Sequence, residues 1–299
     1  MEKEQQHTVS ECYLENFSDE EGYVWVLDIS DKIFRVKPNN ILKERHFYTL
    51  TSINQEKNFA VEDFLGRIES DYINVFRKKL SKNLFLTDEE RVIVSAFIAA
   101  LMDRTRPQRN ALKSSLQKIK DWMGERQSRP DIDSHIKAAI PSSGRTISFD
   151  SLKYGLEHFE EYHSASIPRT LSHRAALIYH MKWSVWINKD YGFVTSDDPV
   201  VLLRPASIKK FGFGSLGSAP GLRWKDVELT LPLSKDRLLL AGWILNEDSY
   251  MSANNEMARN IDHRTITHSH DRIIASLKAR AEDIKSRYNK KKIIKLRNS

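Results

Sequence analysis

Four side chains with acid–base or charge-stabilising chemistry are the predicted catalytic residues: His7, Glu69, Arg104 and Asp197. Histidines and carboxylates transfer protons near neutral pH, and an arginine stabilises negative charge on a phosphate. Brought together by folding, the four would suit hydrolysis of a phosphodiester bond. His7 would act as general acid or base, and the two carboxylates as a second base or as metal ligands. Each position also has an interpretation that needs no ligand.

Glu69 and Arg104 are charged residues on predicted helix faces that are otherwise apolar. Glu69 lies four residues after Leu65 and three before Tyr72, and Arg104 continues a face that includes Leu101. A buried ionised group costs several kcal/mol unless it is paired. The two are therefore expected to meet each other or a polar pocket. A buried ion pair without a catalytic task is the alternative.

The segment FVTSDDPV, residues 193–200, places Ser196, Asp197 and Asp198 at the end of a predicted strand. Pro199 holds Asp198 away from helical geometry. Carboxylates at a strand end bind a divalent cation or act as a base, and equally often they accept backbone amides in a turn. The pattern predicts Asp197 and Asp198 as ligands of Mg²⁺ or Mn²⁺, with Ser196 contacting the substrate. A turn without a ligand is the alternative.

His7 lies just ahead of a predicted helix start, where Ser10 is a suitable N-cap for a helix beginning at Glu11. The cap and the positive end of the helix dipole hold the chain at such a position. His7 could be presented there as a general base or metal ligand, with Tyr13 on the first turn contacting the substrate. In the alternative, the ring of His7 bonds to a carbonyl and anchors the terminus.

Two further substrate contacts are predicted from local sequence. Arg106 lies in the run RTRPQR, residues 104–109, which could hold a phosphate or be the basic end of a helix favoured by its dipole. Ser234 follows Pro232 in the segment TLPLS, and a proline inside an apolar strand pattern indicates an edge or a strand end beside an opening. We predict that Arg106 and Ser234 contact the substrate.

Hydrophobic periodicity and turn signals predict the elements that must position these residues. Helices are predicted over 61–80, 92–102, 110–123, 131–140, 149–162, 171–182, 249–260 and 271–287, with a capping box at Thr87-Asp-Glu-Glu90. Strands are predicted over 23–29, 32–36, 183–187, 192–195, 200–203, 227–231 and 237–243. The expected fold class is α+β. A helical central block would pack on a mixed or antiparallel sheet built from N-terminal and C-terminal strand groups.

Composition narrows the class of protein. The 299 residues carry a formal charge of +7, and we expect a single α+β domain over 1–284 followed by a basic tail over 285–299. With Cys12 as the only cysteine, neither an intramolecular disulfide nor a thiolate metal cage can form within one chain. The sequence contains no run of 18 apolar residues, so it does not predict a membrane span. A cytoplasmic protein is expected, with nucleic acid as its partner through the tail, unless the tail is only a solvated end.

Several segments resemble, in order, the domain-of-unknown-function family numbered 4238. They are QHTVSECYLENF (6–17), HFYTL (46–50), the helix of Glu69, TDEERVIVSAFIAALMDRTRPQR (87–109), FVTSDDPV (193–200) and TLPLS (230–234). The order of the motifs is more specific than any one of them. The chain departs from the usual family pattern at Ser10, which replaces a proline, and at Asp198, which replaces an asparagine. The resemblance carries no established activity.

The resemblance does imply that His7, Glu69, Arg104 and Asp197 belong to one shared site, since all four fall in recurring motifs. Two hypotheses from different classes follow. In the first, the protein is a phosphodiester hydrolase, a nuclease used against foreign nucleic acid. In the second, it is a non-catalytic ligand-binding or nucleic-acid-binding regulatory protein whose polar cluster fixes the fold.

Overall fold

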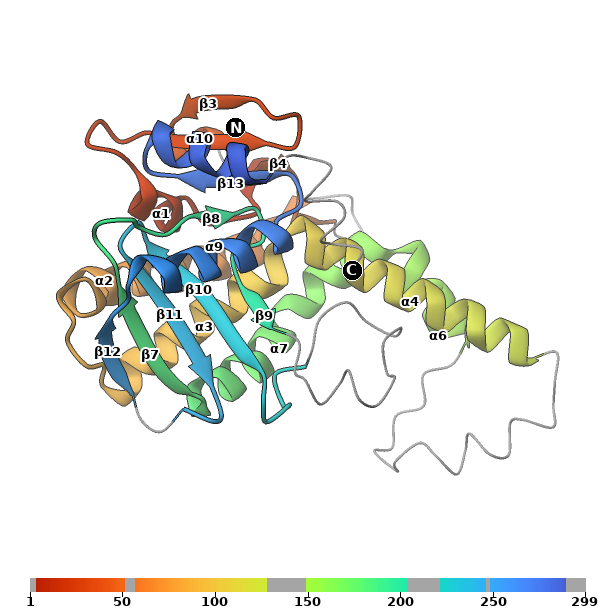
Figure 1. Ribbon diagram of the computed structural model, residues 1–299. Helices are drawn as coiled ribbons and strands as arrows, with labels where there is room; N and C mark the ends of the chain where they lie inside the picture. Colours follow the sequence, from red (N-terminus) through yellow and green to blue (C-terminus); the bar gives the residue numbers. More distant parts are fainter. Residues whose placement is uncertain (1–3, 52–56, 128–148, 204–220, 246–247, 289–299) are drawn as a thin grey trace.

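The computed structural model describes residues 4–51, 57–127, 149–203, 221–245 and 248–288. The fold is α+β, as the sequence predicts. The helices are α1 (Glu11–Leu14), α2 (Ala60–Lys78), α3 (Asp88–Arg104), α4 (Arg106–Gln127), α6 (Phe149–Glu157), α7 (Phe159–His180), α9 (Asn255–His268) and α10 (Lys278–Arg287). Figure 1 shows α4 and α6 projecting from the body that the other elements form. The helix predicted over 131–140 lies outside the described residues.

The larger sheet is mixed and has the strand order β12-β7-β11-β10-β9. Its strands are β7 (Lys182–Ile187), β9 (Val201–Leu203), β10 (Glu228–Ser234), β11 (Arg237–Gly242) and β12 (Ser249–Ser252). Among the described pairings of this sheet, that of β12 with β7 is parallel and the others are antiparallel. β9 pairs with β10 only as far as Thr230, so Pro232 lies where one side of β10 has no strand beside it. This agrees with the predicted strand edge at that proline.

Helices cover both faces of this sheet. Leu239 of β11 packs in the cluster that includes Phe97 of α3, whereas its neighbour Leu238 packs with Ile261 of α9. Successive side chains of a strand point to opposite faces, so α3 and α9 lie on opposite sides. Figure 1 shows α3 and α7 behind the sheet and α9 across its front. The continuous apolar run of β11 is the pattern of a strand buried on both faces.

The N-terminal hairpin shares a sheet with two later strands, as predicted, but the remaining late strands form the larger sheet described above rather than joining it. β2 (Val24–Asp28) and β3 (Ile33–Val36) join β13 (Arg272–Ala275) and β8 (Thr195–Ser196) in the order β3-β2-β13-β8. The predicted helix over 271–287 is therefore wrong at its start. Ile273 and Ile274 are buried in β13 between β2 and β8, because strand pairing outweighs the helical pattern of that run. Likewise, residues 249–252 form β12 and α9 begins only at Asn255.

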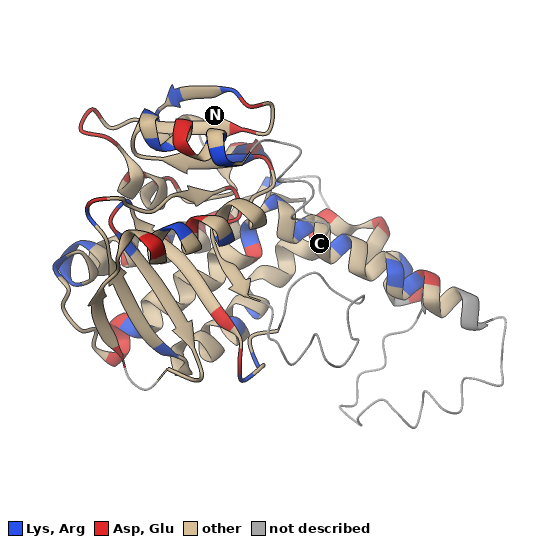
Figure 2. Ribbon diagram, viewed as in Figure 1, with Lys and Arg blue, Asp and Glu red and all other residues tan. Residues whose placement is uncertain are grey.

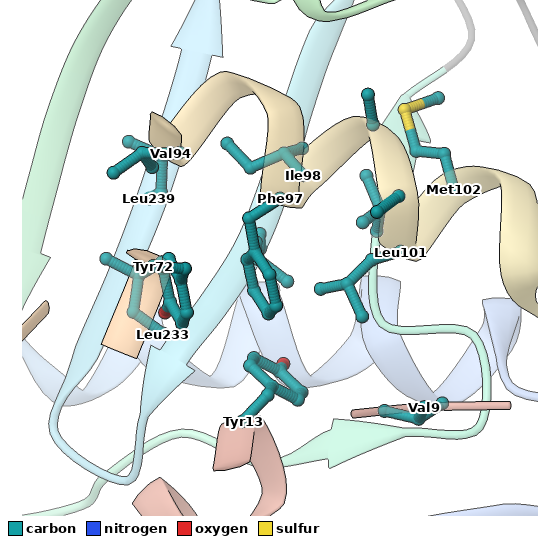
Figure 3. Packing of buried hydrophobic residues seen from close by; sticks show 14 of the residues in the cluster. Val9, Tyr13, Tyr72, Val94, Phe97, Ile98, Leu101, Met102, Leu233 and Leu239 are labelled. Carbon is teal, nitrogen blue, oxygen red and sulfur yellow. The ribbon is translucent and has the colours of Figure 1, made fainter. Parts of the chain in front are cut away.

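The core is centred on Phe97 of α3 (Figure 3). Its ring stacks on that of Tyr72 of α2, with centroids 3.6 Å apart, and lies 6.2 Å from the ring of Tyr13 of α1. The start of α3 is set by the predicted capping box, in which Thr87 and Glu90 each bond the other's backbone amide. α7 packs along α3 and runs without interruption through Pro168, so the two helices predicted over 149–162 and 171–182 have different boundaries.

The N-terminal strand β1 (Gln5–His7) pairs antiparallel with β4 (Lys43–Arg45), and β5 (Leu50–Thr51) pairs with β6 (Lys57–Asn58). α1 begins at Glu11 as predicted. The Ser10 side chain makes no capping bond, however, because its hydroxyl contacts the Cys12 thiol at 3.1 Å. The predicted boundary between domain and tail at residue 285 falls inside α10, and residues 289–299 lie outside the described part. No described helix is both long and apolar enough to cross a membrane.

Burial of His163 in α7 predicts a pH-dependent stability. Burial, together with the positive charge of Arg109, lowers the pKa of His163 to about 4. The folded protein therefore holds this ring neutral, whereas the unfolded chain binds a proton below its ordinary value of 6.5. From pH 7.5 to pH 5, this difference should lower the free energy of unfolding by about 2 kcal/mol. Urea denaturation at the two pH values measures it.

His163→Gln should remove that part of the pH dependence. His158→Gln is the matched control, because His158 is exposed at the start of the same helix. Equal pH dependence in both variants would show that the ring of His163 does not stay neutral in the fold.

Candidate functional site

Arg104 lies at the centre of the predicted constellation. It is the last residue of α3, and its side chain is 1% exposed. The guanidinium forms an ion pair with Glu69 of α2 and donates through Nε to the carbonyl oxygen of His7 at 3.2 Å. Burial lowers the pKa of Arg104, but Glu69, Tyr48 and Glu62 together outweigh this effect and the pKa is raised. The predicted meeting of these two charged residues is therefore confirmed.

His7 lies in β1, ahead of the helix start predicted at Glu11. Its ring is hydrogen-bonded to the backbone of Asn39, which anchors the terminus. The same ring lines a groove of ≈1190 Å³. Burial, and then the charge of Arg104, lower the pKa of His7, so the ring is neutral at pH 7. The charged residues of the groove are mainly acidic: Glu11, Glu62, Asp63 and Asp71, against Lys43 and Arg67.

Asp197 is held apart from this group. One carboxylate oxygen accepts the backbone amide of His270 at 3.0 Å and the other accepts that of Asp271 at 2.7 Å. Burial raises the pKa of this carboxyl. Asp197 lines a cavity of ≈520 Å³ together with Arg106, whose guanidinium pairs with Glu44 at 2.8 Å. The structure thus joins His7, Glu69 and Arg104 in one cluster and places Asp197 with Arg106 in another.

Asp198 and Ser196 complete the strand-end motif without an open coordination site. Asp198 accepts the hydroxyl of Thr105 at 3.2 Å and the amide of Gln108 at 3.1 Å, and it lies 3.0 Å from Nε2 of His268. The Ser196 hydroxyl donates to the Asp198 carbonyl at 2.9 Å.

The two aspartates do not fit the predicted Mg²⁺ or Mn²⁺ site, since every carboxylate oxygen already faces a donor. No group of three or more metal-ligating side chains occurs within the part of the chain that the structure describes.

Tyr13 and Ser234, predicted as substrate contacts, stabilise the fold. The fully buried Tyr13 hydroxyl donates to the carbonyl of Pro232 at 2.7 Å and lies 2.7 Å from the hydroxyl of Thr195. Burial raises its pKa strongly, so it stays protonated. The Ser234 hydroxyl donates to Asp236 at 2.6 Å in the turn between β10 and β11. It lines a third cavity, of ≈740 Å³, that none of the other predicted site residues lines.

The sequence motifs are nevertheless joined by direct contacts. Arg104 links α3 to β1 and α2, and the next residue, Thr105, links α3 to Asp198. Tyr13 links α1 to β8 and β10. The motifs therefore form one connected hydrogen-bond network. Their four predicted catalytic side chains do not converge on one solvent-connected point.

A fourth cavity, of ≈370 Å³, lies beside Asp198 and was not predicted from the sequence. We call it the His268 cavity. Its polar lining residues are Gln108, His173, Arg174, Arg223 and His268, and the others are Trp224, Met102, Leu177, Val200, Leu202, Gly221 and Leu222. Among the described residues that line it there is no carboxylate. This arrangement can attract an anion and can transfer protons through two histidines.

The polar residues of the His268 cavity come from α4, α7, α9 and the segment before β10. His173 and Arg223 lie 3.5 Å apart between Nε2 and Nη2, and Arg174 pairs with the buried Asp103 at 2.5 Å. The histidines are visible in the sequence, but their spacing fits no metal-binding motif. The contact between His268 and Asp198, 70 positions away in the sequence, is what singles out this cavity. No local sequence pattern predicts that contact.

The comparisons identify a family but not an activity. A family model described as "Protein of unknown function (DUF4238)" matches residues 5–279. No match was found among curated proteins or among solved structures.

The Glu69–Arg104 pair predicts a large loss of stability when only one partner is removed. Glu69→Ala leaves a buried guanidinium without its counter-ion and should lower the free energy of unfolding by about 3 to 5 kcal/mol. Glu69→Leu combined with Arg104→Met should recover part of that loss, because no charge then remains buried. Denaturant unfolding measures both.

Glu44→Ala is the matched control. Glu44 pairs with Arg106, whose side chain is 54% exposed, and its loss should cost less than about 1 kcal/mol. Similar losses for Glu69→Ala and Glu44→Ala would contradict the central role assigned to Arg104.

Proposed function

Because this chain belongs to the DUF4238 family, whose description assigns no activity, we propose its function from the geometry: it hydrolyses phosphodiester bonds of nucleic acid in the His268 cavity. The single observation that carries the proposal is the contact between Asp198 and His268 at the wall of a cavity whose charged lining residues are all basic. An acid–base group and an anion-binding surface thus occupy one place.

The charges of the cavities decide which of them suits a phosphodiester. The groove beside His7 is lined by four carboxylates and two basic side chains, so it repels a polyanion. The cavity beside Asp197 mixes both signs. The His268 cavity adds Arg174 and Arg223 to its two histidines. Of these three cavities, the His268 cavity therefore suits a phosphate best.

The carboxylate of Asp198 supports proton transfer by His268. Asp198 is 1% exposed and is fixed by Thr105 and Gln108, so it holds the imidazole in one orientation. A histidine oriented by a buried carboxylate is a common device for general acid–base catalysis. Arg223 is exposed, and no carboxylate of the described chain pairs with it, so it is available to a phosphate oxygen.

A binding protein without chemistry is the second candidate. It is favoured by the observation that the polar side-chain atoms of the motif residues Tyr13, Arg104 and Asp197 are occupied by contacts within the fold. In that case the His268 cavity would retain a phosphate ligand without cleaving it. The two candidates differ in whether an incubated oligonucleotide is shortened.

Incubation of the purified protein with end-labelled RNA and DNA, with and without Mg²⁺ or Mn²⁺, tests the proposal. Cleavage is expected, and His268→Gln should lower its rate by about 10²- to 10⁴-fold, the usual contribution of a general acid or base. Gln keeps a donor for Asp198, so folding should be retained. Arg223→Ala should weaken substrate binding.

His180→Ala is the control, since His180 is an exposed histidine of α7 that lines none of the four cavities described above. Its cleavage rate should equal that of the unchanged protein. Binding of oligonucleotide without any shortening would favour the second candidate. Cleavage that His268→Gln leaves intact would place the site elsewhere.

A further inference from the structure

We propose that the substrate is RNA and that the nucleophile is the 2′-hydroxyl of the RNA itself, with His173 and His268 as the two proton-transfer groups. The inference rests on the proposed function and deepens it. The observation behind it is that two histidines from different helices, α7 and α9, line the same cavity together with two arginines. Transfer of the phosphoryl group to a neighbouring hydroxyl needs one base and one acid.

The carboxylates near the cavity are not arranged to activate a metal-bound water. Asp198 faces Thr105, Gln108 and His268. Asp103 faces Arg174 through one oxygen and accepts the Thr170 hydroxyl at 3.0 Å through the other. Both carboxylates thus neutralise or orient neighbouring side chains. The donor set of this wall does not fit a divalent cation.

A nucleophile supplied by the substrate removes the need for such an activated water. The 2′-hydroxyl of a ribonucleotide lies next to its own 3′-phosphorus. An intramolecular attack gains the advantage of high effective concentration without cost to the enzyme. DNA lacks this hydroxyl. The residue types in the His268 cavity therefore favour RNA over DNA.

The charges around the two histidines assign their roles. Asp198 stabilises the protonated imidazolium of His268, so His268 begins the step as the proton donor. His173, which has no carboxylate beside it among the described residues, takes the complementary role of base. Arg223 lies 3.5 Å from His173 and is placed to contact the same phosphate that His173 serves.

His173 accepts the proton of the 2′-hydroxyl while O2′ forms a bond to phosphorus. The bond from phosphorus to O5′ breaks, and O5′ takes the proton of His268. The products are a 2′,3′-cyclic phosphate and a free 5′-hydroxyl. Water then opens the cyclic phosphate, with the two histidines exchanging roles and returning to their starting states.

Trp224 supplies a surface for a base beside this phosphate. It lines the cavity and is 38% exposed, whereas Leu222 beside it is buried. Unpaired RNA bases stack on exposed aromatic rings, each contact contributing about 1–3 kcal/mol. Single-stranded RNA is therefore the form that fits, because a base in a duplex could not reach the ring.

The first test compares substrates with the full chain in EDTA. An RNA oligonucleotide should be cut to fragments ending in a 2′,3′-cyclic phosphate, identified by mass spectrometry, and the same sequence with 2′-deoxy or 2′-O-methyl sugars should stay intact. Cleavage of the deoxy oligonucleotide, or RNA products that never carry a cyclic end, would overturn the inference while leaving the proposed function standing. Cleavage of neither RNA nor DNA in EDTA would overturn the inference, and the same result with added Mg²⁺ or Mn²⁺ would overturn the proposed function as well.

The second test separates the acid from the base. Uridine 3′-(4-nitrophenyl phosphate) has a leaving group that needs no proton, whereas the leaving 5′-oxygen of a dinucleotide does. His268→Gln should lose at least about 100-fold on the dinucleotide and less than about tenfold on the nitrophenyl ester. His173→Gln should lose at least about 100-fold on both. Equal losses for His268→Gln on the two substrates would overturn the assignment of His268 as the acid.

Discussion

The burial of one guanidinium constrains much of the molecule. Arg104 is held inside the protein at the C-terminal end of α3, where an unpaired charge would cost several kcal/mol. Its donors are satisfied only if α2 brings Glu69 and β1 brings the carbonyl of His7 to the same point. The short β1–β4 pair is thereby tied to α2 and α3. The positions of the next residues, Thr105 and Gln108, follow from this fixed helix end.

This constraint explains why the residues with the strongest motif signals are not those available for chemistry. Polar side-chain atoms of Arg104, Tyr13 and Asp197 form hydrogen bonds with backbone groups of other segments. Their contacts fix the part of the fold that positions Asp198. Thr105 and Gln108 bond Asp198 on one side, and the face toward α9 is left for His268. The contacts that stabilise the fold at Arg104 thus continue through Thr105 and Asp198 to His268, which lines a different cavity.

Local physics accounts for what the sequence predicted. The capping box at Thr87, the apolar stripe of α2 and the strand runs of β7 and β11 depend on neighbours within a few residues. The burial cost of unpaired charges was enough to predict the Glu69–Arg104 pair. The division into two sheets and the amide donors of Asp197 depend on which distant segments meet. Hydrophobic period and secondary-structure propensity are local properties of the sequence, so they do not predict which distant segments pair.

In the His268 cavity, basic side chains of the wall contact carboxylates that lie inside the protein. His268 ends α9, where the negative end of the helix dipole favours a positive charge, and Asp198 adds a second favourable term. Asp103 does the same for Arg174 from behind the wall. Each buried carboxylate lies against a basic side chain of the wall and is not itself among the described lining residues. The counter-charges of Arg174 and His268 therefore come from inside the protein, and the described side chains that meet a ligand in the cavity carry no negative charge.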